Sequence, residues 1–263
     1  MNTRMKKWFA AACLFGGLFS VQAAQAAHAA QAEAQGDLKG TNVVLVHGAF
    51  ADGSSWSKVI PLLEARGAHV VAVQNPLSSL ADDVAATKRV IDAQTGPVVL
   101  VGHSWGGVVI SQAGNDEKVK ALVYVAAFAP DSGVSINDML KGKPAPTWVS
   151  QLQKDSGGFL TLSTDAIVHQ FAQDLPLPEA RLVAATQGPW FSGCTDDKVT
   201  TAAWHTKPSW FVLAEQDHMI DPGLQQVMAT QIGATVTRVK SSHVAMLSQP
   251  KAVAAVIAAA AKK

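Results

Sequence analysis

The sequence predicts an α/β fold: a mostly parallel sheet covered by helices on both faces, with a helical cap inserted between two late strands. Three observations lead to this expectation. Short apolar, β-branched runs alternate with segments of helical periodicity along most of the 263 residues. The runs are apolar throughout, which is typical of parallel strands buried on both faces. The alternation is interrupted once, by about residues 131–207, which contain Gly, Pro and helical fragments but no strong strand pattern.

The elements follow one another in a regular β/α order. A Pro near the start and a Gly just past the end mark the first helix of the domain, and Leu80, Val84 and Ile91 share one face of the second. The predicted strands cover residues 41–46, 69–74, 98–102, 121–127, 209–214 and 234–239. The predicted helices cover residues 59–66, 80–94, 105–113, 222–232 and a terminal segment that starts at residue 250.

The N-terminus has the composition of a secretory signal peptide. A basic start is followed by an apolar run over residues 8–21, which is shorter than the roughly 20 residues that span a bilayer. Ala24-Gln25-Ala26 fits a cleavage site, so we expect a signal peptide of residues 1–26 and a periplasmic or secreted protein. The alternatives are a membrane anchor or a lipoprotein attached at Cys13.

The part after the signal divides into a leader and a domain. Residues 27–40 are rich in Ala and Gln and predict a mobile leader, while residues 41–263 form the expected folded domain, with the cap inside it. No later run is long enough to span a membrane, so no stable membrane anchor is expected once the signal is removed. If Cys13 is removed with it, Cys194 is the sole cysteine and an internal disulfide is impossible.

The charge balance excludes a large class of partners. The 21 Lys and Arg residues nearly cancel the 20 Asp and Glu residues, which leaves a formal charge of +1. No basic excess exists to bind a phosphate backbone, so nucleic acid is not expected as a partner. Cys and His spacing typical of zinc is also missing from the sequence, and no metal site is expected.

The segment Gly102-His103-Ser104-Trp105-Gly106 fits the G-x-S-x-G pattern. An apolar strand precedes it and a helix follows it, which is the setting of a nucleophile elbow. Such a turn strains the backbone at Ser104 and needs small residues where the strand and the helix approach each other. Ser104 is therefore the predicted nucleophile, projecting above the carboxyl ends of the strands.

A base and an acid are expected after later strands. His243 follows the last strand and is the predicted base, because a Ser hydroxyl is a weak nucleophile without one. Asp217 follows the strand at residues 209–214 and is the predicted acid, which orients the imidazole. The order Ser, Asp, His is that of α/β-hydrolases. The alternatives are His205 and His218 for the base, and Asp131 and Asp221 for the acid, although Asp221 also suits a helix cap.

Two backbone N–H groups are expected to stabilise the oxyanion that forms on the attacked carbonyl. One belongs to Trp105, directly after the nucleophile. The other comes from the loop after the first strand, where Ala49 is the first choice and Phe50 the second. Gly48 lets this loop pass close to the elbow. We expect His47 to hold the loop by a hydrogen bond.

The segments VLVHGAFADGSSW, VLVGHSWGG, FVLAEQD and SSHVAMLSQP give the chain a family resemblance over about residues 41–260. It resembles the α/β-hydrolase superfamily, in the branch of small esterases near plant methyl-salicylate esterases and hydroxynitrile lyases. The lyases typically carry Thr after the first-loop His and Lys after the catalytic His. Here those positions are Gly48 and Val244, which favours hydrolysis over cyanohydrin cleavage.

The cap is rich in aromatic residues and poor in charge. Part of this set packs the cap itself, and the rest is expected to line an apolar pocket over Ser104. The candidates for the pocket are Phe50, Trp148, Phe171 and Trp190. No cluster of Lys or Arg indicates an anionic substrate, and Cys194 is expected to be an inert, semi-buried thiol.

Together these features predict a secreted serine hydrolase that cleaves a small, mostly apolar carboxylic ester or lactone through an acyl-enzyme. The substrate is the expected small-molecule partner, no cofactor is needed, and the oligomeric state stays open. The alternatives are a cofactor-free perhydrolase or haloperoxidase, an enzyme that cleaves a C–C bond, or a non-catalytic ligand-binding protein on the same fold.

Overall fold

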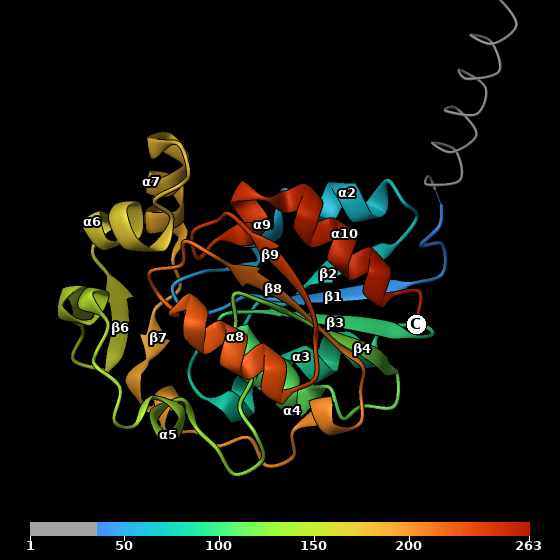
Figure 1. The fold of residues 1–263 in the computed structure, drawn as a ribbon, viewed down its shortest axis with the longest axis horizontal. Coiled ribbons are helices and arrows are strands. Elements are labelled where there is room, and N and C mark those ends of the chain that lie inside the picture. The colour runs from blue at the N-terminus through green and yellow to red at the C-terminus, as the bar shows by residue number, and fades with distance from the viewer. Residues whose placement is uncertain (1–35) are drawn as a thin grey trace, which may run out of the picture. The chain divides into compact units, whose positions relative to one another are not determined.

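A computed structural model describes residues 36–263, and the predicted signal peptide and most of the predicted leader lie outside these residues. Residues 38–263 form a single α/β unit around a six-stranded sheet with strand order β2-β1-β3-β4-β8-β9 (Figure 1). All pairs of neighbouring strands in this sheet are parallel. The predicted α/β fold with a parallel sheet and helices on both faces is therefore confirmed.

The strands lie within two residues of their predicted bounds. Three of the four inner strands, β1, β3 and β8, are buried over their whole length, and the fourth, β4, has a single exposed residue. The six strands are β1 (Asn42–Val46), β2 (His69–Ala72), β3 (Val98–His103), β4 (Val119–Val125), β8 (Ser209–Ala214) and β9 (Thr235–Val239).

Helices cover the sheet on both faces, as right-handed β-α-β crossovers require. The crossover from β1 to β2 runs along the sheet in the direction opposite to the later crossovers, so its helix, α2, lies on the other face from α3, α4 and α8. The terminal helix α10 lies on the same face as α2 (Figure 1). The covering helices are α2 (Ile60–Glu64), α3 (Leu80–Asp92), α4 (Gly106–Ala113), α8 (Pro222–Gln231), α9 (Ala245–Ser248) and α10 (Pro250–Ala260).

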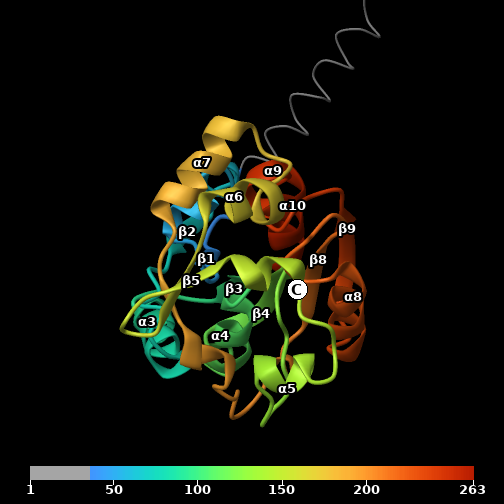
Figure 2. The same ribbon diagram turned by 90° about the vertical axis from the view of Figure 1, so that its left-hand side faces the viewer.

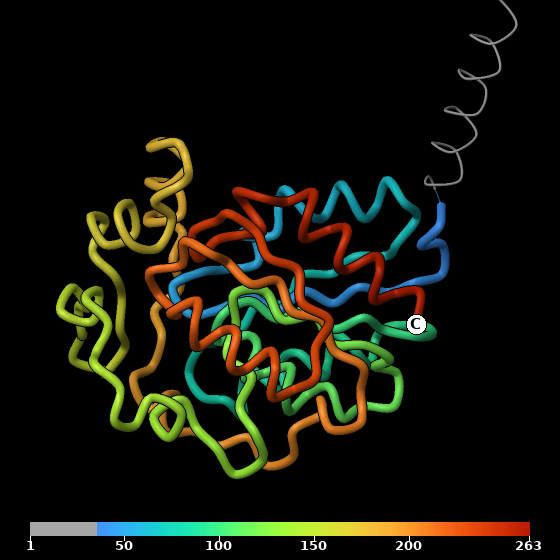
Figure 3. The backbone as a smooth tube through the Cα atoms, in the orientation of Figure 1, coloured from blue at the N-terminus to red at the C-terminus, as the bar shows by residue number. Residues whose placement is uncertain are grey.

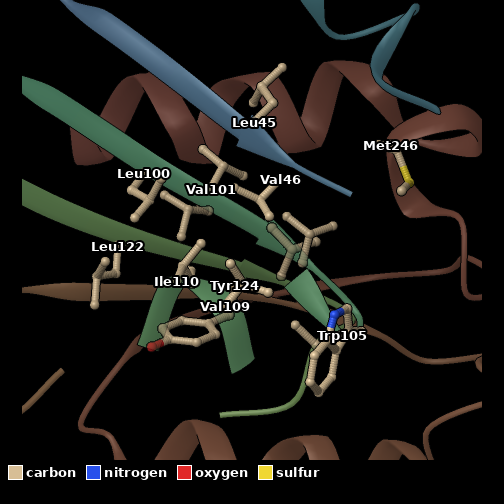
Figure 4. Packing of buried hydrophobic residues seen from close by; sticks show 14 of the residues in the cluster. Leu45, Val46, Leu100, Val101, Trp105, Val109, Ile110, Leu122, Tyr124 and Met246 are labelled. Carbon is tan, nitrogen blue, oxygen red and sulfur yellow. The ribbon is translucent and has the colours of Figure 1, made fainter. Parts of the chain in front are cut away.

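The core lies between these layers. Side chains of β1, β3 and β4 meet those of α4 there, and the hydroxyl of Tyr124 is hydrogen bonded to Ser111 at 3.0 Å (Figure 4). Burying such side chains contributes roughly 1.5–3 kcal/mol each. The dense core below the elbow fixes the ends of β3 and β4, from which Ser104 and its neighbours project.

The cap is the chain between β4 and β8, and it lies over the carboxyl ends of the strands (Figures 2 and 3). It contains α5 (Ile136–Leu140), α6 (Thr164–Ala166), a π-helix over Ile167–Phe171, and α7 (Leu177–Thr186). It also contains an antiparallel sheet of β5 (Leu152–Lys154), β6 (Phe159–Leu162) and β7 (Trp190–Phe191).

The cap was expected to be helical, and it contains a short antiparallel sheet in addition to its helices. The three cap strands are too short to show a period of two residues in the sequence. A usable signal lay in the turn between the first two. There Asp155 accepts hydrogen bonds from the N–H groups of Gly157 and Phe159, each at 2.9 Å, which closes a hairpin.

The packed unit also begins earlier than predicted. The leader was expected to run to residue 40, but Leu38 is only 1% exposed and belongs to the core. Its N–H donates to the carbonyl of Arg66 at 3.0 Å. A single leucine within a polar segment gives no periodic pattern, which is why the sequence could not reveal this anchor.

Candidate active site

The nucleophile elbow has the strained geometry that its motif predicts. Ser104 follows β3 directly and has φ of +53°, a left-handed conformation that costs a non-glycine residue roughly 1–3 kcal/mol. Its N–H donates to the carbonyl of Val125 at 3.3 Å, and its own carbonyl accepts from Phe128 at 3.2 Å. A Cβ at Gly106 would lie 2.5 Å from the carbonyl oxygen of Val46. The turn is therefore clamped between β4 and β1, with no room for a larger residue.

An imidazole and a carboxylate form a buried pair beside this elbow. The Nδ1 atom of His243 is 2.8 Å from Oδ2 of Asp217, and the exposed fractions of the two residues are 1% and 3%. Because an ionised carboxylate only accepts, Nδ1 carries the proton and Nε2 is left as the basic nitrogen. Asp217 follows β8 and His243 follows β9, so neighbouring parallel strands bring the two together at one edge.

The Asp217 carboxylate is held from three further directions. Its Oδ1 accepts from the N–H groups of Met219 at 2.7 Å and Ile220 at 3.0 Å, and its Oδ2 accepts from Nε2 of Gln225 at 2.8 Å. Gln225 is fully buried and also accepts from the N–H of Ala214 at 3.1 Å. The orientation of the acid is thus fixed before any substrate binds.

His103, next to Ser104, links the elbow to His243. Its Nε2 donates to the carbonyl of His243 at 3.0 Å, and the two rings are 4.6 Å apart between centroids. Burial, aided by the neighbouring His243, holds the pKa of His103 well below its usual value. His103 is therefore neutral at ordinary pH. Because His103 is bonded to Ser104 in the chain and contacts His243, it holds these two residues near each other.

The loop after β1 approaches the elbow closely. A Cβ at Gly48 would lie 2.6 Å from Cβ of Ser104, so only glycine fits there without movement. Within residues 36–263, the backbone N–H groups of Ala49 and Trp105 donate to no protein acceptor, although both residues are buried. Phe50 shares this property and has φ of +57°. Buried, unpaired N–H groups are rare in proteins, and here they are available to an incoming oxyanion.

His47 holds this loop in place, as expected. Its Nε2 accepts from the N–H of Asn75 at 2.9 Å, and its Nδ1 donates to the carbonyl of Gly48, also at 2.9 Å. Burial lowers the pKa of His47, which is consistent with a neutral ring that accepts at Nε2.

Three of the four aromatic residues predicted for the pocket form a continuous set of ring contacts. The ring of Phe50 is 5.9 Å from that of Trp190 and 6.5 Å from that of Trp148, both edge to face. Trp190 also lies 5.5 Å from Trp105. Phe171 lies apart from this set and packs its ring against His243, 5.0 Å between centroids. It therefore contacts the predicted base, which the sequence did not indicate.

The Trp105 indole has a buried charged partner. Its Nε1 donates to Oδ2 of Asp83 at 2.7 Å, and the other carboxylate oxygen accepts from the N–H of Leu77 at 2.8 Å. Burial raises the pKa of Asp83 to about 6. This side chain, which the sequence reasoning missed, orients the residue that carries one of the candidate oxyanion donors.

The alternative acids and bases lie in other arrangements. His205 and Asp131 pair with each other at 2.7 Å on the surface, and this contact lowers the pKa of Asp131. Asp221 caps α8 by accepting from the N–H of Leu224 at 3.0 Å. His218 is exposed. None of these four residues contacts His243 or Ser104 in the described part of the chain.

Cys194 is buried, and burial raises the pKa of its thiol to about 12, so the thiol is protonated and unreactive at ordinary pH. Among residues 36–263, no group of three or more His, Cys, Asp or Glu side chains could hold a metal ion. No helix of these residues is long and apolar enough to cross a membrane.

A cavity of about 730 Å³ lies against the acid side of this arrangement. Its wall includes Asp217, Met219 and Phe128 from the sheet side, and Leu224 and Val227 from α8. Trp148 reaches the same wall, because its Nε1 donates to the carbonyl of Met219 at 3.1 Å. Trp148 therefore contacts both Met219, on the wall of this cavity, and Phe50, which belongs to the loop that carries the candidate oxyanion donors.

The model of the alpha/beta hydrolase family matches residues 43–256. The chain belongs to this family. Methylesterase 2 of Arabidopsis thaliana is 26% identical over 243 residues, which cover 79% of this chain and 91% of that protein. This relative agrees with the branch of plant esterases that the sequence motifs resemble.

Solved structures show the same fold. A pyrethroid hydrolase from Sphingobium faniae superposes with a TM-score of 0.73 at 22% identity, covering 84% of this chain and 97% of its own. An extracellular alpha/beta-hydrolase from a Paenibacillus species, described as sharing structural and functional homology with tobacco Salicylic Acid Binding Protein 2, reaches 0.73 at 19% identity. It covers 85% of this chain and all of its own. At these identities the likeness concerns the fold alone.

Proposed function

We propose that the protein is a serine hydrolase that cleaves a small, mostly apolar carboxylic ester or lactone through an acyl-enzyme. The observation that carries the proposal is the buried His243–Asp217 pair at 2.8 Å beside a serine held at φ of +53°. The name of the family relative, a methylesterase, supports ester hydrolysis as the reaction class.

The chemistry follows from the arrangement of these groups. His243 Nε2 takes the proton of Ser104 Oγ as that oxygen attacks the ester carbonyl, and a tetrahedral oxyanion forms. The N–H groups of Trp105 and Ala49 donate to this oxyanion. The C–O bond to the alcohol then breaks, and His243 returns its proton to the departing alkoxide. A water molecule, deprotonated by His243, attacks the acyl-Ser104 ester, and the acid product leaves as Ser104 regains its proton.

Neighbouring groups keep the base in the correct state. The negative charge of Asp217 stabilises the imidazolium that forms during attack. Two backbone N–H groups and Gln225 hold this carboxylate in position. Removal of one oxyanion donor typically costs about 3–4 kcal/mol of transition-state stabilisation. No step requires a metal or an organic cofactor.

The side chains over the elbow support an apolar, neutral substrate. Phe50, Trp148 and Trp190 supply ring surface, and none of the three carries a charge. The same region disfavours cyanohydrin cleavage. Position 48 has no room for the Thr of the lyases, and Val244 is a buried apolar residue where they carry Lys.

Labelling tests the nucleophile directly. A fluorophosphonate probe is expected to add its mass to the peptide that contains Ser104, and the Ser104→Ala variant is expected to remain unlabelled. The two proteins are then compared on p-nitrophenyl esters of increasing chain length, on lactones and on methyl aryl esters. Labelling that survives Ser104→Ala, or folded wild-type protein that takes up no probe, contradicts the proposal.

Export is a separate part of the proposal. The basic start, the apolar run of residues 8–21 and Ala24-Gln25-Ala26 support cleavage after Ala26 and a periplasmic or secreted enzyme. N-terminal sequencing of protein recovered from the periplasm or the medium is expected to begin at Ala27. Full-length protein retained in the cytoplasm is the contrary result.

A further inference from the structure

Two neighbouring residues of the cap hold the loops that carry the acid and the base. Nε2 of Gln173 donates to the carbonyl of Gln216 at 2.6 Å, and Gln216 directly precedes Asp217. Oδ2 of Asp174 accepts from the N–H of Ser242 at 2.8 Å, and Ser242 directly precedes His243. Consecutive cap residues thus contact the chain one residue before each member of the buried pair.

Other contacts join the same elements. The N–H of Gln216 donates to the carbonyl of Ser241 at 3.0 Å, which ties the acid loop to the base loop. Phe171, at the end of the π-helix, packs its ring against His243 at 5.0 Å. Residues 171–174 therefore contact the acid loop, the base loop and the imidazole itself.

We infer that Gln173 and Asp174 are positioning residues that align His243 with Asp217 and Ser104. The cap therefore contributes to the geometry of the catalytic site. This inference rests on the proposed serine hydrolase function. Neither residue touches the reacting atoms, and both act through the backbone of the residue before the acid or the base.

The two residues differ in how much they are expected to contribute. Ser242 is buried although Asp174 itself is exposed, so losing the Asp174 carboxylate leaves the N–H of Ser242 without a protein partner and frees the base loop to move. Gln216 is exposed, so water can replace part of what the amide of Gln173 supplies, and Gln173→Ala is expected to lower kcat by less than Asp174→Ala. The carboxylate of Asp217 is also held by N–H groups of its own loop, whereas His243 receives its contacts from the cap through Asp174 and from the elbow through His103, in addition to the hydrogen bonds of Ser241. The base is therefore the more sensitive partner.

Four variants and two readouts test the inference. In Asp174→Ala we expect kcat and the rate constant of fluorophosphonate labelling to fall about tenfold with KM within about twofold, because a misplacement of about 1 Å can cost up to a hundredfold. Asp174→Asn keeps an acceptor oxygen and is expected to stay within about threefold of wild type. The matched controls are Asp165→Ala and Gln153→Ala, which change exposed cap residues away from both loops and are expected to behave as wild type.

The outcomes separate this inference from the proposed function. If the probe does not react with Ser104 in the wild-type protein, the proposed function itself fails. If the wild-type protein reacts and Asp174→Ala reacts at the rate of Asp165→Ala, the positioning role is wrong. A loss confined to KM also contradicts it, because misalignment of the base acts on kcat.

Circular dichroism and thermal unfolding identify a variant that does not fold. Should Asp174→Ala be one, Gln173→Ala carries the test, since it removes a single exposed hydrogen bond. A fall in kcat greater than that of Gln153→Ala supports the inference, and equal values of kcat overturn it.

Discussion

Asp83 makes the stability of this protein depend on pH in a direction opposite to that of most surface carboxylates. Burial raises the pKa of Asp83 from its usual 3.8 to about 6, so the folded state binds the proton more tightly than the unfolded state. Stability from this group is therefore full below pH 3.8 and is lost as the pH rises through 6. The complete change is about 3 kcal/mol, and about 2 kcal/mol of it falls between pH 4.5 and 7.

The substitution Asp83→Asn removes this titration. Guanidinium unfolding of wild type and variant at a series of pH values gives the difference in their free energies of unfolding. We expect wild type to lose about 2 kcal/mol relative to the variant between pH 4.5 and 7. The neighbouring exposed residue provides a matched control: hydrogen bonds from Ser78 and Ser79 lower the pKa of Asp82, so wild type should not lose stability relative to Asp82→Asn as the pH rises.

A difference between wild type and Asp83→Asn that stays constant from pH 4.5 to 7 would refute the reasoning. It would mean that the hydrogen bonds from Trp105 and Leu77 fully compensate the burial of the carboxylate. A difference that grows with pH in favour of wild type would reverse the sign of the effect.

Three further substitutions test individual parts of the site. Gly48→Ala places a Cβ 2.6 Å from Cβ of Ser104, so kcat/KM should fall at least tenfold while far-UV circular dichroism is unchanged; wild-type activity would show that the loop has spare room. Gln225→Leu removes three buried hydrogen bonds, which should cost about 3 kcal/mol in urea unfolding, whereas Gln226→Leu, at a half-buried position of α8 whose side-chain hydrogen bonds are exposed, should cost less than 1 kcal/mol. Trp148→Ala removes the ring between Phe50 and the carbonyl of Met219, so the ratio of kcat/KM for long-chain over short-chain p-nitrophenyl esters should rise; an unchanged ratio would separate Trp148 from the substrate.

The parts of the site that sequence could predict are those with a local signature. Ser104 lies between an apolar strand and a helix, and its strained φ follows from that motif alone. Asp217 and His243 follow predicted strands, and parallel strands present their carboxyl ends at one edge, so their contact follows from the order of elements.

The supporting residues could not be predicted, because their partners are distant in the chain. Gln225 is one of several glutamines on its helix, and only the folded structure shows that it contacts Asp217. Asp83 reaches Trp105 from another helix, and Asp174 reaches Ser242 from the cap. The short cap strands escaped for a different reason, since strands of two to four residues carry no readable period.

The proposed reaction forms a covalent intermediate in which the acyl group of the ester is bound to Ser104. The most direct measurement is mass spectrometry of protein mixed with a p-nitrophenyl ester and quenched in acid within the first turnovers, followed by peptide mapping. We expect the mass of the acyl group on the peptide that contains Ser104. In His243→Ala, a larger fraction of that peptide is expected to carry the acyl group if deacylation slows more than acylation. An adduct on another residue, or ester hydrolysis that continues at the wild-type rate in Ser104→Ala, would contradict it.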